Sequence, residues 1–181
     1  MITLILADDH PLTMEGLKAL LSREGDFSVV GEYADGESAL LGITELRPQV
    51  ALLDIRMPIL DGVAVAKRVT DLKLPTACLM LTSYDAKPYV AASMRAGAKG
   101  YVLKSSPPEV ICEAIRTVSR GRLFLDLEAS DLVSSGPTEE LSQREREVLL
   151  LASRGLASKE IASRLVISDR TDKAHMASIY G

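Results

Sequence analysis

The sequence predicts an α/β fold, a doubly wound five-stranded parallel sheet with a small all-α domain after it. Two observations carry this prediction. Over the first 120 residues, short apolar segments alternate with longer segments whose apolar residues recur at helical spacing. After residue 141 the pattern is helical only. Strands and helices in strict alternation favour a parallel sheet covered by helices on both faces.

The predicted strands are nearly continuous apolar runs, without the alternation of a half-exposed strand. This is typical of parallel strands buried on both faces. The runs are residues 2–7, 28–34, 50–54, 76–82 and 100–103.

The predicted helices lie between and after these runs and carry apolar stripes at helical spacing. Pro107 and Pro108 suit a helix start, and Gly121 suits a helix end. The pattern is weakest in the fourth helix. The five helices are predicted at residues 11–24, 36–47, 61–72, 85–96 and 107–120.

Composition sets broad limits on the function. A length of 181 residues suffices for one such domain and a small module, and the core must be aliphatic because aromatic residues make up 4%. Neither half is strongly basic, so composition alone does not indicate nucleic-acid binding.

Cys78 and Cys112 are interpreted as small buried residues in a reducing compartment. No segment approaches the roughly 20 apolar residues of a membrane span, and we expect a cytoplasmic protein without a membrane partner.

Charged and polar residues stand at the carboxyl ends of the predicted strands, where ligands bind in such sheets. They are Asp8, Asp9, Asp54, Thr82 and Lys104. Three converging carboxylates repel one another, and Mg²⁺, which prefers oxygen ligands, would relieve that repulsion. A carboxylate can accept a phosphoryl group, and an ammonium and a hydroxyl can bind its oxygens. Asp8, Asp9 or Asp61, taken alone, would more often cap the following helix than bind a ligand.

The residues around these positions form four motifs. They are Ala7-Asp8-Asp9-His10, Leu53-Asp54-Ile55-Arg56-Met57-Pro58 with Asp61-Gly62, Leu81-Thr82-Ser83, and the run from Ala96 to Lys104. The segment from residue 2 to about residue 121 thereby resembles the flavodoxin-like receiver domain of two-component response regulators, in the LuxR/FixJ (NarL-like) subfamily.

That resemblance implies specific roles. Asp54 would accept a phosphoryl group from a sensor histidine kinase, with Thr82 and Lys104 assisting. Asp9, Asp54 and the backbone carbonyl of Arg56 would hold Mg²⁺, and Asp8 would act through water. Thr82 and Tyr101 would form the switch pair, the aromatic ring following Thr82 inward on phosphorylation.

The C-terminal part contains helix starts and stops at short intervals. Ser142 and Glu145 form a capping box, Gly155 ends that helix, and Ser158 and Ser168 cap two more. A short helix, a tight turn and a further helix are typical of a helix-turn-helix, although a plain three-helix packing module has the same periodicity.

The sequence of these helices resembles that of LuxR-type DNA-binding domains. The resemblance lies in Leu141-Ser142 with Arg144-Glu145, in Lys159-Glu160-Ile161-Ala162 and in Ile167-Ser168. The resemblance implies that Lys173, Ala174 and Ala177 face bases, while Lys159, Thr171 and His175 lie nearer phosphates or helix packing. We therefore predict a receiver at residues 1–121, a linker at 122–140 whose apolar residues suggest a short docked helix, and a DNA-binding domain at 141–181.

Two departures weaken the DNA-binding prediction. Asp172 stands where the family has an apolar residue, and a carboxylate there would be buried at a cost or would repel phosphate. The family also has a further helix, so the domain is interpreted as incomplete. We expect weak or absent DNA binding by this chain.

The leading hypothesis is a transcription regulator, not an enzyme, controlled by phosphorylation and dimeric on activation. A second is a receiver that signals through protein–protein contacts, with a degenerate tail that does not bind DNA. A third, a phosphoaspartate hydrolase, usually needs a second aspartate two residues after the first, and Arg56 stands there.

Overall fold

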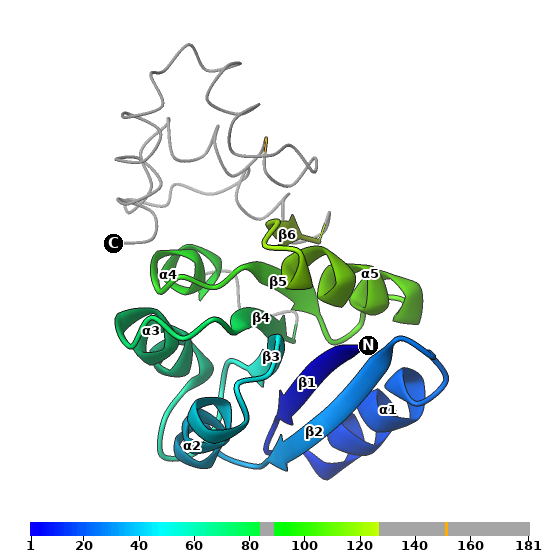
Figure 1. Ribbon diagram of the computed structural model, residues 1–181, viewed down its shortest axis with the longest axis horizontal. Coiled ribbons are helices and arrows are strands. Elements are labelled where there is room, and N and C mark those ends of the chain that lie inside the picture. The colour runs from blue at the N-terminus through cyan, green and yellow to red at the C-terminus, as the bar shows by residue number, and fades with distance from the viewer. Residues whose placement is uncertain (84–88, 127–150, 152–181) are drawn as a thin grey trace.

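The computed structural model describes residues 1–83, 89–126 and 151. Its centre is a six-stranded sheet in the order β2-β1-β3-β4-β5-β6, with every neighbouring pair parallel (Figure 1). The strands are β1 (Ile2–Ala7), β2 (Phe27–Tyr33), β3 (Val50–Asp54), β4 (Ala77–Thr82), β5 (Gly100–Leu103) and β6 (Phe124–Leu125). The predicted doubly wound parallel sheet is confirmed, with one strand more than expected.

Helices cover both faces of the sheet (Figure 1). They are α1 (Pro11–Leu21), α2 (Gly36–Leu46), α3 (Gly62–Asp71), α4 (Tyr89–Arg95) and α5 (Pro108–Ser119). The side chains of Asp35 and Asp61 cap α2 and α3, accepting from the backbone N–H groups of Ser38 at 2.8 Å and Ala64 at 2.7 Å. All five predicted helices are present, and α1, α2, α3 and α5 are one to three residues shorter than predicted.

The core has two layers because alternate residues of each strand point to opposite faces. Leu4 and Leu6 pack on the face that α1 and α5 cover, while Ile5 and Ala7 pack on the face of α2, α3 and α4. β3 is buried along its whole length. This explains the continuous apolar runs in the sequence.

A sixth strand lies at the start of the predicted linker. Phe124 and Leu125 extend the sheet, with the Phe124 N–H donating to the Lys99 carbonyl at 3.0 Å, and the short docked helix suggested for part of the linker falls largely outside the described residues. Two residues carry no periodicity, so no pattern could predict them. The strand covers the edge of β5.

The rest of the linker and nearly all of the predicted DNA-binding domain lie outside the described residues. So do its candidate contacts, namely Lys159, Thr171, Lys173, Ala174 and Ala177, together with Asp172 and His175. Among the helices that are described, none is long and apolar enough to cross a membrane.

Candidate phosphoryl-acceptor site

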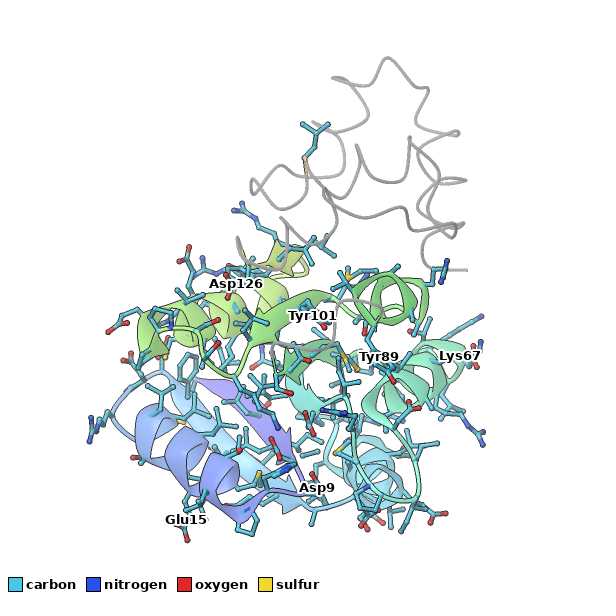
Figure 2. The ribbon with its side chains drawn as sticks, turned by 180° about the vertical axis from the view of Figure 1, so that it is seen from behind. Asp9, Glu15, Lys67, Tyr89, Tyr101 and Asp126 are labelled. Atoms are coloured by element: carbon cyan, nitrogen blue, oxygen red, sulfur yellow. The ribbon has the colours of Figure 1, made fainter. Side chains whose placement is uncertain are left out.

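Three carboxylates meet at the carboxyl edge of the sheet, as the strand pattern predicted. Asp8 and Asp9 directly follow β1, and Asp54 is the last residue of the adjacent strand β3. One ligand atom from each of these residues and from His10 lies within 4.8 Å of the others. In Figure 2, Asp9 lies beyond the end of the blue strand β1.

Lys104, which follows β5, joins two of these carboxylates. Its Nζ atom lies 2.7 Å from Oδ2 of Asp8 and 3.0 Å from Oδ1 of Asp54. The side chains of Asp8 and Asp54 are only 1% and 7% exposed. A buried carboxylate needs a compensating charge, and Lys104 provides it.

The environment opposes the charge on Asp54. Burial raises the pKa of Asp54 above its ordinary value, and the neighbouring Asp8 adds to this, while Lys104 lowers that pKa in part. Burial also lowers the pKa of Lys104, but contacts with Asp8 and Asp54 outweigh it, so this pKa ends above its ordinary value. One ammonium does not fully compensate the Asp54 carboxylate.

The donor set fits a hard divalent cation such as Mg²⁺. Oδ2 of Asp8 is fully buried and accepts no hydrogen bond of normal geometry within the described part of the chain, although Lys104 Nζ is close enough for an ion pair. Asp8, Asp9 and Asp54 supply the oxygen ligands that Mg²⁺ prefers. Arg56, whose backbone carbonyl is the fourth predicted ligand, lies just beyond β3 and is exposed.

Thr82 and Tyr101, the predicted switch pair, lie on the adjacent strands β4 and β5. Both are buried, and a hydrogen bond joins their side chains. Burial raises the pKa of Tyr101 to about 12, and the bond to Thr82 offsets part of that rise. Thr82 Oγ1 also donates to the Ser83 carbonyl at 3.1 Å.

Comparison with known proteins agrees with this geometry. Residues 4–116 match the response regulator receiver domain, and residues 139–181 match the bacterial regulatory proteins of the luxR family. The chain belongs to the response regulators. Members of this family act as two-component transcription regulators rather than as enzymes.

Relatives of this response regulator span nearly its whole length. The oxygen regulatory protein NreC of Staphylococcus aureus is 35% identical over 97% of this chain and 88% of its own. The response regulator ChrA of a heme-sensing two-component system is 34% identical, covers 97% of this chain and 86% of its own, and has a TM-score of 0.65. The signal receiver domain of the response regulator NarL from Mycobacterium tuberculosis is 40% identical over 67% of this chain and 98% of its own, with a TM-score of 0.65.

His10 belongs to the response regulator's acidic cluster, although the sequence analysis gave it no role there. Its Nδ1 atom lies 2.8 Å from Oδ1 of Asp9 and 3.1 Å from Oδ1 of Asp8. Its backbone N–H also donates to Oδ1 of Asp8 at 2.9 Å. In the sequence, only the position of His10 directly after Asp9 could have indicated these contacts, because nothing else distinguishes an exposed histidine.

Gly62 is a second residue of the site whose role the sequence did not predict. A β-carbon there would lie 2.2 Å from the backbone carbonyl oxygen of Asp54, and the Gly62 N–H donates to the Ile55 carbonyl at 2.9 Å. The start of α3 therefore packs directly against the residue that carries the central carboxylate. Glycine is needed for this close approach.

Proposed function

We propose that this response regulator accepts a phosphoryl group on Asp54 from a sensor histidine kinase, with Mg²⁺ bound, and that phosphorylation switches DNA binding by its C-terminal helix-turn-helix. The observation that carries this proposal is the convergence of Asp8, Asp9, Asp54 and Lys104 at one edge of the sheet. Such a protein would act in the cytoplasm.

The transfer is a displacement at phosphorus. A carboxylate oxygen of Asp54 forms the new P–O bond, and the bond from phosphorus to the donor nitrogen of the kinase histidine breaks, that nitrogen keeping the electron pair. Asp9, Asp54 and the Arg56 carbonyl would hold Mg²⁺, with Asp8 acting through water. The ion would supply positive charge that stabilises the phosphoryl oxygens.

Lys104 and Thr82 then change partners. Lys104 Nζ, which lies 3.0 Å from Oδ1 of Asp54, would move to a phosphoryl oxygen. The Thr82 hydroxyl, which donates to the Ser83 carbonyl, would donate to another oxygen. Because the Tyr101 side chain is hydrogen-bonded to Thr82, a movement of Thr82 would be transmitted to β5.

A groove beside the site gives the kinase a place to dock. It has a volume of about 410 Å³ and runs between α1 and the start of α5, reaching Lys104. Leu12 stands on its rim and is 84% exposed. Leu12 therefore lines the same groove as Lys104, which contacts Asp54.

The DNA part of the proposal comes from the family match over residues 139–181. A solved structure of RcsB, described as two dimers bound to two parallel DNAs, is 26% identical over 99% of this chain and 92% of its own, with a TM-score of 0.69. We extend dimerisation and DNA binding to this chain, with Lys173, Ala174 and Ala177 at bases and Lys159 and Thr171 at phosphates.

Asp172 weakens that binding in our proposal, because a carboxylate in the recognition helix repels phosphate or is costly to bury. Phosphorylated wild-type protein and an Asp172→Val variant should be compared by footprinting on the regulated DNA. We expect the variant to protect DNA at lower protein concentration. Equal protection would remove the proposed effect of Asp172.

The phosphorylation step is tested by intact mass. The full chain is incubated with Mg²⁺ and a small phosphodonor, and we expect a gain of one phosphoryl group that requires Mg²⁺. Asp54→Asn should abolish the gain, whereas Asp71→Asn, which changes an exposed carboxylate at the end of α3, should keep it. Labelling that persists in Asp54→Asn would overturn the proposal.

A further inference from the structure

The loop between β5 and α5 carries Lys104 and is held at several points. The Lys104 N–H donates to the Thr82 carbonyl at 2.6 Å, and the Ser106 N–H donates to the Leu103 carbonyl at 3.1 Å. Ser106 also has a side-chain partner far along the sequence, since its hydroxyl donates to Oδ2 of Asp126. The loop is therefore tied to the chain that leaves the sheet after β6.

Asp126 is itself fixed in place. It is 9% exposed, and its backbone N–H donates to the carbonyl of Tyr101 at 3.1 Å. Leu125, directly before it, packs in the same core cluster as Tyr101. Figure 2 shows Asp126 and Tyr101 close together on this side of the sheet.

A nearly buried carboxylate is stable only where it is hydrogen-bonded, and a hydroxyl bond to a carboxylate is stronger than a bond between neutral groups. The contact between Ser106 and Asp126 therefore restrains the loop two residues after Lys104. The same Asp126 is anchored through its backbone to the strand of Tyr101. One residue at the start of the connection between the domains thus contacts elements that carry Lys104 and Tyr101.

We propose that Asp126 is a positioning residue, which holds Lys104 through Ser106 and couples the chain leaving the receiver to the phosphoryl site. This inference rests on the function proposed above for Asp54 and Lys104. When Lys104 moves to a phosphoryl oxygen, its loop shifts, and Ser106 transmits the shift to Asp126. Because Asp126 holds the loop that presents Lys104, loosening Asp126 weakens binding at the phosphoryl site, and binding there in turn alters Asp126.

The test measures the affinity of the full chain for beryllium trifluoride, a phosphoryl mimic, in the presence of Mg²⁺. Ser106→Ala and Asp126→Asn should each weaken binding about three- to tenfold, because the first removes the hydrogen bond and the second removes the charge that strengthens it. The double variant should be no weaker than the weaker single variant, because both changes act on the contact between Ser106 and Asp126. Ser106→Thr keeps the hydroxyl and should restore affinity.

Ser105→Ala is the matched control, since Ser105 is the exposed neighbour in the same loop. It should bind as the wild type does. Wild-type affinity in both Ser106→Ala and Asp126→Asn, additive effects in the double variant, or an equal loss in Ser105→Ala would each overturn the inference.

A second measurement does not depend on variants that must fold. Hydrogen exchange of the Asp126 amide in the wild-type chain should change at least threefold when the mimic and Mg²⁺ bind. An unchanged rate would contradict the coupling. If the wild type neither binds the mimic nor gains a phosphoryl group, the proposed function fails, whereas binding that ignores Ser106 and Asp126 removes only this inference.

Discussion

The Nζ atom of Lys104 lies 3.0 Å from Oδ1 of Asp54, so the proposed nucleophile and the cation that stabilises its product are already in contact. The same ammonium contacts Asp8 at 2.7 Å. Lys104 compensates the buried carboxylates in this structure. In our proposal it also binds a phosphoryl oxygen in the phosphorylated state.

Lys104→Met should lower the free energy of unfolding by about 1–3 kcal/mol in EDTA, because the buried carboxylates of Asp8 and Asp54 lose their compensating charge. Mg²⁺ should recover much of the loss. Urea denaturation with and without Mg²⁺ measures both effects. Lys67→Met is the control, since its ion pair with Asp71 is exposed, and its effect should stay within about 0.5 kcal/mol. Equal losses in the two variants would contradict the assigned role of Lys104.

Asp54→Asn should stabilise the metal-free protein at neutral pH. Burial raises the folded-state pKa of Asp54 above its ordinary value of 3.8, so the ionised form is disfavoured in the folded state. The stability that the protonated carboxyl contributes is full below the unfolded pKa and is lost as pH rises through the folded pKa. The variant's advantage should therefore be present at pH 7 and shrink as pH falls through the folded pKa towards 3.8. Urea titrations in EDTA across this range measure it, and a variant less stable than wild type at pH 7 would refute the prediction.

Gly62→Ala should destabilise the receiver by about 1–3 kcal/mol, since the new β-carbon would lie 2.2 Å from the Asp54 carbonyl oxygen. It should also slow phosphorylation, because the strand end that carries the acceptor must shift. Gly16→Ala is the control: a β-carbon at this exposed position of α1 meets nothing within 4 Å. That change should raise stability by about 0.5–1 kcal/mol. Chemical denaturation compares the two, and a tolerated Gly62→Ala would show that the approach is looser than described.

Tyr101→Phe should tighten binding of beryllium trifluoride by about two- to tenfold. The change removes the phenol hydroxyl that is hydrogen-bonded to Thr82, so the Thr82 hydroxyl is freer to turn towards the phosphoryl group. Fluorescence or calorimetric titration with Mg²⁺ present measures the affinity. Tyr33→Phe, on the strand β2 at the other edge of the sheet, serves as the control. Weaker binding by Tyr101→Phe would show that this hydrogen bond belongs to the phosphorylated state.

The sequence predicted the sheet and the meeting of Asp8, Asp54 and Lys104, because strand ends in a parallel sheet share one edge. It could not predict the contact between Ser106 and Asp126. That contact joins two loops without periodicity, and the strand that aligns them is two residues long. The sequence also could not predict the role of Gly62. Its close approach to the Asp54 backbone depends on how α3 packs, which no local pattern encodes.

The proposed function depends most directly on which residue carries the phosphoryl group. The wild-type chain should be phosphorylated with Mg²⁺ and a small donor, reduced with borohydride, which converts an acyl phosphate to an alcohol, and mapped by peptide mass spectrometry. We predict reduction at Asp54 alone, and none when Mg²⁺ is omitted. Reduction at Asp8 or Asp9, or a label that resists borohydride and lies on a histidine or a hydroxyl residue, would contradict the account.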